Sequence, residues 1–253
     1  MDPLLSLKAV SMSYWRGERC VRVLDGVSLD VHPGELVTVW GQHNSGKTTL
    51  LKLAAGLAKP TEGSVSFAGR DLKDLSAGGL ARLLRGPIAL ARPTGPNSAE
   101  LRMRDYVGMA LLRGHSHTRA RRLATAALER VGAGQCAAAR WRDLSDSDRT
   151  LVALAHALVR SPRLLLLDDQ TASLDDIQRE DVMELLRTAA EREQLAVLAT
   201  VPEMTALVHA HTIRSLSGGQ LLAPADPQER EGEVIDFPAG GASRRTGAGG
   251  APA

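Results

Sequence analysis

The chain has 253 residues, of which 43% are hydrophobic and 24% are charged, a composition typical of globular proteins. Its 31 basic and 29 acidic side chains nearly balance, which argues against nucleic acid as the main partner. Cys20 and Cys136 match no metal-binding or redox spacing, and we expect free thiols in a reducing cytosol. The start lacks the pattern of a signal peptide, and no apolar run approaches the ~20 residues that span a bilayer. Any membrane role is therefore expected to come through a partner.

Two strands, at 5–10 and 21–31, are predicted around a turn at 16–18. Tyr14 and Trp15 lie between them, in a chain with only 3% aromatic residues. An aromatic ring just upstream of a phosphate-binding loop can stack on a purine base, by analogy with base stacking worth ~1–3 kcal/mol. We favour Tyr14 over Trp15 for this contact; the alternative is that the rings cap a strand at the surface.

A phosphate-binding loop is predicted within 37–50, which reads V-T-V-W-G-Q-H-N-S-G-K-T-T-L. Gly41, Gly46, Lys47 and Thr48 satisfy the pattern G-x-x-x-x-G-K-[ST]. The pattern requires a strand before the loop and a helix after it, and the periodicity predicts both. A chance glycine-rich turn is therefore a poor explanation.

The chemistry expected of this loop is the binding of a nucleoside triphosphate together with Mg²⁺. Glycines let the backbone aim several N–H groups at one anion, and the helix N-terminus adds partial positive charge. We expect Lys47 to reach the β- and γ-phosphates and the Thr48 hydroxyl to ligate Mg²⁺. The other candidate nucleotide-binding residues of the loop are Asn44, Ser45 and Thr49.

The middle of the chain is predicted to be a helical insertion that follows a short apolar strand. The expected elements are a strand at 87–91, a loop at 92–98, helices at 103–112 and 117–131, a small-residue linker at 133–140 and a helix at 148–159.

A second phosphate-site element is predicted where the apolar strand 163–167 ends in Asp168 and Asp169. In phosphate-loop proteins such an Asp meets the Mg²⁺ that the loop hydroxyl ligates. We favour this role for Asp168 over a simple strand cap, and we expect Asp169 to orient or deprotonate water.

The last part of the chain predicts further strands and helices and then a tail. The expected elements are a helix at 177–192, a strand at 195–201, a short helix at 202–208, a hairpin at 212–217 and 221–222, and a largely disordered stretch at 227–253. Strands that alternate with helices predict an α/β fold with a parallel sheet.

With these motifs in place, residues 5–222 resemble the ATP-binding subunit of an ABC transporter. The opening V-S-M-S-Y-W…V-R-V-L-D-G-V-S-L-D-V-H-P-G-E-L-V-T-V-W-G is most similar to the lipoprotein-release and macrolide-export branch. The resemblance implies a nucleotide-binding domain at 1–225, with a helical subdomain at about 92–160 and an antiparallel β edge, followed by a tail at 226–253. It also implies a head-to-tail dimer that sandwiches two ATP molecules, each between one loop and the opposite signature.

The family signature is expected about 24 residues before the strand-end Asp, where the chain reads Leu144-Ser145-Asp146-Ser147-Asp148. The leucine and Ser145 are retained, both glycines are replaced, and the glutamine position is acidic. Residues 216–220 spell Leu-Ser-Gly-Gly-Gln in full, but they lie between two predicted strands. A signature must present its serine from a helix N-terminus, and we therefore interpret 216–220 as a hairpin turn.

Other positions also depart from the family pattern. The catalytic glutamate is replaced by Asp169 and the proline after it by Gln170. The switch histidine aligns with Val201, which has no polar side chain, and the glutamine that couples to the membrane partner aligns near Arg92. The dimer-contact motif is retained at 173–175.

These departures predict ATP binding with slow hydrolysis, because the loss of a well-placed general base costs ~10²–10⁴ in rate. Asp146 and Asp148 would also face the partner's triphosphate, a like-charge contact that costs several kcal/mol. The expected function is an ATP-binding subunit, on the cytoplasmic face of the membrane, that couples Mg-ATP binding and hydrolysis to a separate permease. The alternative is a regulatory ABC subunit with essentially no ATPase activity. A GTPase or small-molecule kinase is disfavoured because the chain has no guanine-reading N-K-x-D motif and because the spacings of the signature helix and the dimer-contact motif match an ABC protein. Homodimer and heterodimer remain open.

Overall fold

The computed structural model describes residues 2–168, 173–201 and 209–222. Asp169, the expected helix at 202–208 and the expected tail at 226–253 lie outside the described residues. The first 223 residues form one compact unit.

An antiparallel sheet of four strands forms the N-terminal layer, in the order β2-β1-β4-β5. Its strands are β1 (Leu5–Arg16), β2 (Arg19–Val31), β4 (Glu62–Phe67) and β5 (Arg70–Asp71). The first two strands are longer than predicted, because Tyr14 pairs with Val21 and Arg16 with Arg19 across the turn. This extension places Tyr14 in the paired part of β1, opposite Val21 of β2.

A second sheet of six strands has the order β10-β9-β3-β8-β7-β6. Its strands are β3 (Leu36–Trp40), β6 (Ile88–Ala91), β7 (Leu164–Asp168), β8 (Ala196–Val201), β9 (Thr212–Ser217) and β10 (Gln220–Leu222). All neighbours are parallel except β9 and β10, which form a hairpin. The carboxyl ends of β3 and β7 therefore lie on the same side of the sheet, with only β8 between the two strands.

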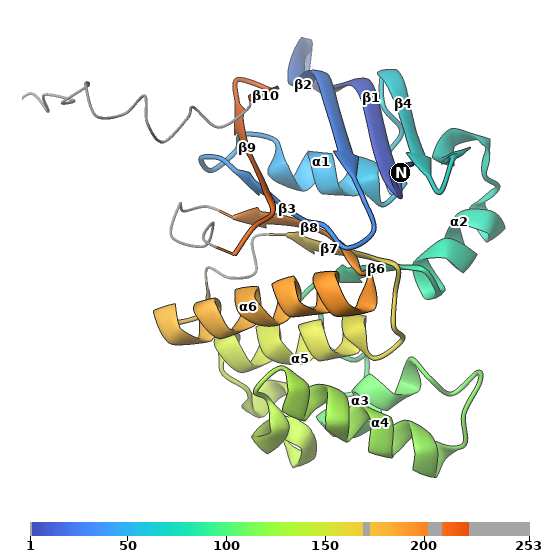
Figure 1. The fold of residues 1–253 in the computed structure, drawn as a ribbon, viewed down its shortest axis with the longest axis vertical. Coiled ribbons are helices and arrows are strands. Elements are labelled where there is room, and N and C mark those ends of the chain that lie inside the picture. Colours follow the sequence, from blue (N-terminus) through green and yellow to red (C-terminus); the bar gives the residue numbers. More distant parts are fainter. Residues whose placement is uncertain (1, 169–172, 202–208, 223–253) are drawn as a thin grey trace, which may run out of the picture. The chain divides into compact units, whose positions relative to one another are not determined.

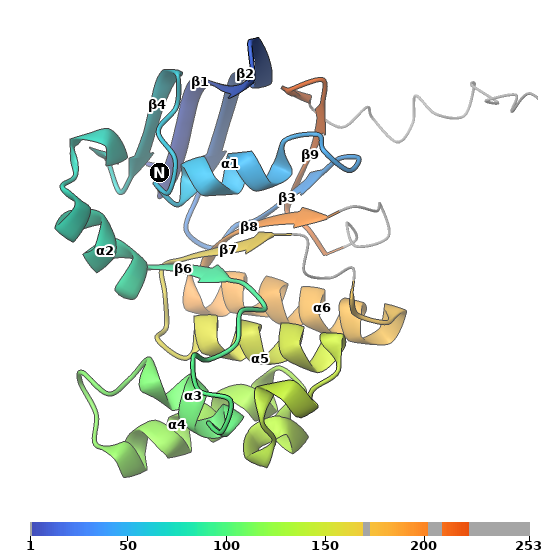
Figure 2. The ribbon, with the colours of Figure 1, turned by 180° about the vertical axis from the view of Figure 1, so that it is seen from behind.

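Helices cover both faces of this sheet, as Figures 1 and 2 show from opposite sides. On one face, α1 (Lys47–Ala54) lies between the two sheets. On the other, α6 (Asp176–Glu193) and α5 (Asp146–Leu158) are followed outward by α3 (Met103–Met109) and α4 (His117–Arg130). Short 3₁₀ turns at 134–138 and 141–143 connect α4 to α5. None of the described helices is long and apolar enough to cross a bilayer.

The helix α2 (Ala77–Arg85) was not predicted. Two glycines in its first turns lower its intrinsic helix propensity, and none of its residues is fully buried. Its N-terminus is nevertheless capped, because Gly79 N–H donates to the Ser76 hydroxyl at 3.1 Å.

The core is divided into two clusters by the parallel sheet. Leu165 and Leu167 of β7 pack with the helices on one face, and Leu164 and Leu166 pack with α1 and the antiparallel sheet on the other. Successive strand residues point to opposite faces, and both faces are buried, which explains the continuous leucine run.

Candidate functional site

The phosphate loop spans 41–46, between β3 and α1. Gly46 caps α1 with φ of 106°, and a Cβ there would lie 3.0 Å from the Val23 carbonyl. A Cβ on Gly41 would lie 2.6 Å from the Leu216 carbonyl, closer than real Cβ contacts allow. Both positions therefore require glycine, one for its conformation and both for close packing of the backbone.

Lys47 lies in the first turn of α1 and is buried, with 6% of its surface exposed. Its Nζ donates hydrogen bonds to the carbonyls of Gly41 at 2.7 Å and Gln42 at 3.0 Å. The loop therefore holds a cation against its own backbone. The Ser45 Oγ is buried and has no hydrogen-bond partner among the described residues. A phosphate group fits here, because its oxygens can accept from the unpartnered Ser45 hydroxyl and pair with the positive charge of Lys47.

Thr48 and Asp168 meet across the sheet although 120 residues separate them. The Thr48 hydroxyl donates to Asp168 Oδ1 at 3.1 Å, and the Thr200 hydroxyl of β8 donates to the same oxygen at 3.4 Å. Among the described residues, no group of three His, Cys, Asp or Glu side chains is placed to hold a metal ion. One hydroxyl and one carboxylate suit Mg²⁺, which takes its other ligands from phosphates and water.

Tyr14 lies in a hollow of about 260 Å³ that adjoins the loop. The hollow is lined by Tyr14, Val23, His43, Asn44, Ser45, Gly46, Lys47, Thr48 and Thr49. Trp15 is not among these residues and is 74% exposed. The structure thus brings the expected loop residues together and distinguishes Tyr14 from Trp15, while contact with a base stays a prediction.

Ser145 is the N-cap of α5, which begins two residues earlier than predicted. Its Oγ accepts a hydrogen bond from Asp148 N–H at 3.1 Å and donates to Asp148 Oδ2 at 2.7 Å. The other carboxylate oxygen, Oδ1, accepts from Cys136 Sγ at 3.3 Å and Gln135 Nε2 at 3.4 Å. The candidate signature serine is therefore bonded within its own helix turn.

This network perturbs two pKa values in a consistent way. Burial acts to raise the pKa of Asp148, but hydrogen bonds from Ser145, Cys136 and Gln135 outweigh it and hold that pKa below its usual value. Burial, reinforced by the Asp148 carboxylate, raises the pKa of Cys136 to about 12. Cys136 thus stays a thiol that donates to a carboxylate.

Asp146, in the first turn of α5, pairs with Arg149 at 3.0 Å, and together with Asp148 it gives the start of this helix two carboxylates. Sequence reasoning missed the thiol contact, which no spacing rule reveals.

The second Leu-Ser-Gly-Gly-Gln stretch is a hairpin, as predicted. Leu216 and Ser217 end β9, and Gln220 begins β10. The turn glycines Gly218 and Gly219 have φ of 57° and 81°. The carbonyl of Gly219 accepts from Asp25 N–H at 2.9 Å, and this links the hairpin to β2 behind the phosphate loop. No α5-like helix N-terminus is formed by this copy within the described residues.

Two of the remaining candidates lie at the carboxyl ends of strands, and two lie before α6. Val201 ends β8 with a fully buried side chain, and Arg92 directly follows β6. Ser173 and Thr150 share a hydroxyl hydrogen bond of 2.8 Å, and Asp175 forms a capping box with Gln178 at the start of α6. The role predicted for Asp169 cannot be placed geometrically, since Asp169 lies outside the described residues.

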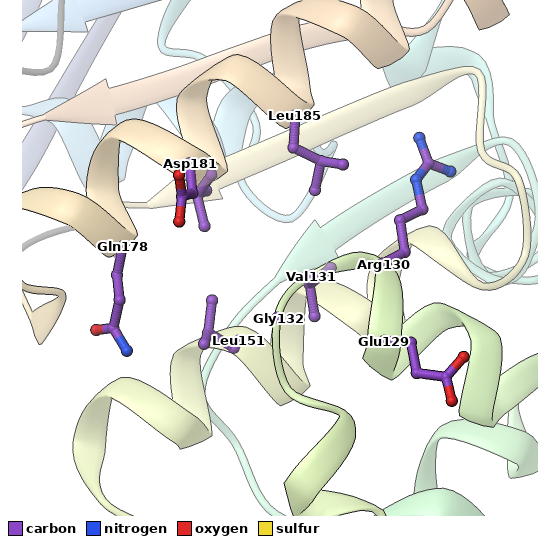
Figure 3. A pocket seen from close by; sticks show the side chains of 9 residues that line it. Glu129, Arg130, Val131, Gly132, Leu151, Gln178, Asp181 and Leu185 are labelled. Atoms are coloured by element: carbon purple, nitrogen blue, oxygen red, sulfur yellow. The ribbon is translucent and has the colours of Figure 1, made fainter.

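A larger hollow of about 360 Å³ lies between α4, α5 and α6, away from the loop (Figure 3). Gln178, Asp181 and Leu185 of α6 line one side of it, and Leu151 and Val131 lie opposite. Its one cation, Arg130, is paired with Glu193 at 2.6 Å. With acidic side chains and no glycine-rich backbone cradle, this hollow does not have the chemistry of a phosphate site.

A family model described as ABC transporter matches residues 24–172, which include the phosphate loop, α5 and Asp168. The chain belongs to the ABC transporter family. The lipoprotein-releasing system ATP-binding protein LolD of Pseudomonas syringae is 36% identical over 220 residues, 87% of this chain and 97% of LolD. The macrolide export ATP-binding/permease protein MacB of an Azoarcus species is 30% identical over 240 residues, 93% of this chain and 36% of MacB.

Among solved structures, a dimeric post-hydrolysis state of the ATP-binding cassette MJ0796 bound to ADP and Pi superimposes with a TM-score of 0.81. The sequences are 26% identical, and the match covers 88% of this chain and 99% of that one. These findings confirm the predicted fold and the predicted role as an ATP-binding subunit of an ABC transporter. The relatives also include both groups named by the sequence resemblance, lipoprotein release and macrolide export.

Proposed function

We propose that this ABC subunit binds Mg-ATP at the phosphate loop, hydrolyses it slowly, and couples binding and hydrolysis to a separate membrane permease. In this proposal the subunit is peripheral on the cytoplasmic face of the membrane, held there by the permease. It dimerises with a second ABC ATP-binding subunit, either a copy of itself or a different chain.

The observation that carries the binding proposal is the contact between Thr48 and Asp168 directly beside Lys47. Lys47 supplies the cation for the β- and γ-phosphates, and Thr48 with Asp168 would hold Mg²⁺. The chemistry that the metal would supply there is neutralisation of phosphate charge. Glycines at 41 and 46 let the loop fold tightly between its neighbours, because a Cβ there would meet the carbonyl of Leu216 or Val23.

Slow turnover is supported by the groups expected to act on water and on the γ-phosphate. Val201, at the switch position, has neither charge nor a hydrogen-bonding side chain. The Ser145 hydroxyl donates its hydrogen bond to Asp148 Oδ2 at 2.7 Å and is therefore not available to a phosphate. Asp169 is one methylene shorter than glutamate, and a displacement of about 1 Å can cost ~10² in rate.

A separate permease is supported by the likeness to LolD. LolD is named as the ATP-binding protein of a lipoprotein-releasing system, and the aligned region covers 97% of it. LolD acts in lipoprotein release, and by this likeness a lipid-modified or otherwise apolar cargo is the favoured class for the permease.

The test is a paired measurement of Mg-ATP affinity and phosphate release on the purified chain. We expect micromolar binding that falls roughly 10- to 100-fold in Lys47→Ala, because a charge-assisted contact is lost. Lys59→Ala, which removes an exposed lysine beyond α1, is the matched control and should leave affinity unchanged. Absence of ATP binding in the unmodified chain would contradict the proposal.

Hydrolysis is tested in the same preparation with Asp169→Glu. Release near background that rises in Asp169→Glu supports a slow ATPase, whereas release that stays at background in both favours the alternative of a regulatory subunit. Brisk release by the unmodified chain would show that the altered positions are compatible with full turnover.

A further inference from the structure

The hairpin formed by α3 and α4 concentrates positive charge. Residues 102–122, called here the basic hairpin, contain six arginines and one aspartate, a net charge of +5. The rest of the chain has 25 basic and 28 acidic residues, a net charge of −3. The excess positive charge of the protein is therefore located in this one structural unit.

Three of these arginines are exposed at or near the hairpin tip. Arg113 lies in the turn, and Arg119 and Arg122 lie on the solvent face of α4. None of the three has an ion-pair partner within the described ranges, whereas Arg121 is paired with Asp105 at 2.6 Å. Guanidinium groups without a carboxylate partner are available to bind phosphate oxygens in a bidentate manner.

Two large apolar side chains are exposed at the same tip. Met109 ends α3 and is 56% exposed, and Leu112 is 39% exposed and precedes Arg113 in the turn. Leu111, between them, is buried and anchors the turn in the hairpin. Exposed apolar side chains next to unpaired arginines are the pattern of a segment that lies at a membrane interface.

The tip is held in place by close packing of its two helices. A Cβ on Gly108 of α3 would lie 3.4 Å from the Ala120 carbonyl and 3.7 Å from the Ala124 Cβ, which shows how near the helices approach. The amides of Gly114 and His115 both donate to the Leu111 carbonyl at 3.1 Å. The arginines and apolar side chains are thus presented together from an ordered turn.

We propose that the basic hairpin binds directly to the surface of a bilayer that contains anionic lipids. Arg113, Arg119 and Arg122 contact headgroup phosphates, while Met109 and Leu112 insert among the upper acyl segments. This contact is independent of the proposed function, in which the permease alone brings the subunit to the membrane. The hairpin is a poor nucleic-acid surface, since its only aromatic residue, Tyr106, already stacks on His156.

The experiment is co-sedimentation of the full chain, without permease, with vesicles. Vesicles of phosphatidylcholine with roughly a third phosphatidylglycerol are compared with pure phosphatidylcholine at low and physiological salt. We expect binding only to the anionic vesicles, weakened by salt. Replacing three arginines by glutamine, as Arg113→Gln, Arg119→Gln and Arg122→Gln together, should lower partitioning about 100-fold. Arg70→Gln, Arg82→Gln and Arg85→Gln together make the same charge change on β5 and α2, and should stay within about threefold of wild type.

The pair Met109→Ser and Leu112→Ser tests the apolar part of the contact and should lower partitioning about tenfold. Binding that falls equally in both arginine triples would show a diffuse charge effect and overturn the site. Binding to an immobilised polyanion such as heparin that exceeds vesicle binding, with the apolar pair unaffected, would indicate an acidic macromolecule instead of a membrane. Equal sedimentation with neutral and anionic vesicles would also overturn the proposal.

Discussion

Tyr106 and His156 stack between α3 and α5, with ring centroids 4.6 Å apart and planes inclined by 10°. The Tyr106 hydroxyl donates to the Thr94 carbonyl at 2.8 Å, which connects this stack to the loop that follows β6. Burial, with a smaller contribution from the charge of Arg160, lowers the pKa of His156 to about 4. At neutral pH the imidazole is therefore uncharged and packs as an aromatic ring.

This residue makes stability depend on pH in a defined window. The pKa of histidine in the unfolded state is ~6.5. Between pH ~6.5 and ~4 the unfolded state therefore binds more protons than the folded state. Stability is complete above pH ~7 and falls as the pH drops from 6.5 towards 4. We expect wild type to lose about 2 kcal/mol between pH 7 and pH 5 relative to His156→Phe, measured by urea unfolding at both pH values. Parallel losses in the two proteins would show that His156 is already solvated.

At the scale of elements, the N-terminus of α5 differs from a phosphate-binding helix end. Ser145 caps the helix, yet its hydroxyl is paired with Asp148, and Asp146 adds a second carboxylate in the first turn. Acidic side chains there interact favourably with the helix dipole and stabilise α5. The same negative charges repel an incoming phosphate. The start of α5 is therefore stabilised by residues that disfavour anion binding, whereas a family signature would bind an anion at this position.

Restoring this helix end should increase turnover. Asp146→Gly, Ser147→Gly and Asp148→Gln together remove two carboxylates and release the Ser145 hydroxyl. We expect phosphate release to rise at least about tenfold, since a like-charge contact of several kcal/mol is removed. Asp143→Asn, which removes an exposed acid just before the helix, is the control and should change nothing. An unchanged rate in a restored variant that still binds ATP would mean that another step limits hydrolysis.

For the whole molecule, the six-stranded sheet determines which distant residues meet. The two core clusters lie on its opposite faces and, among the described residues, are built from positions 4–216. The order β3-β8-β7 places the phosphate loop and Asp168 at one edge. The described buried core residues that support the site therefore all lie within the first 216 residues of the chain.

Removal of 226–253 is therefore expected to leave the nucleotide-binding domain intact. This stretch is rich in Gly, Pro, Ala and charged residues and has few large apolar side chains to bury. We expect the thermal midpoint to shift by less than about 2 °C, and Mg-ATP affinity to stay unchanged, when a chain ending at 225 is compared with the full chain by calorimetry and titration. A larger decrease in the midpoint would show that the tail packs on the domain.

Several elements could be predicted because their signals are local. The leucine run of β7, the glycine turn of the β9–β10 hairpin and the apolar stripe of α6 each lie within a few residues of the features that specify them. The helix α2 was missed because Gly78 and Gly79 mask its start. The lengthening of β1 was missed because it depends on pairing with β2 rather than on its own pattern.

The sequence by itself determined the phosphate loop and the family, and it predicts the replacement of catalytic positions such as Val201, because these are properties of residue type and spacing. Only the tertiary structure decided that Tyr14, and not Trp15, adjoins the loop, and that Asp148 is bonded by Cys136. Both outcomes depend on side-chain direction and on the packing of separate elements. Neither is encoded in the spacing of residues along one chain segment, since the same pattern is compatible with either direction until neighbouring elements pack around it.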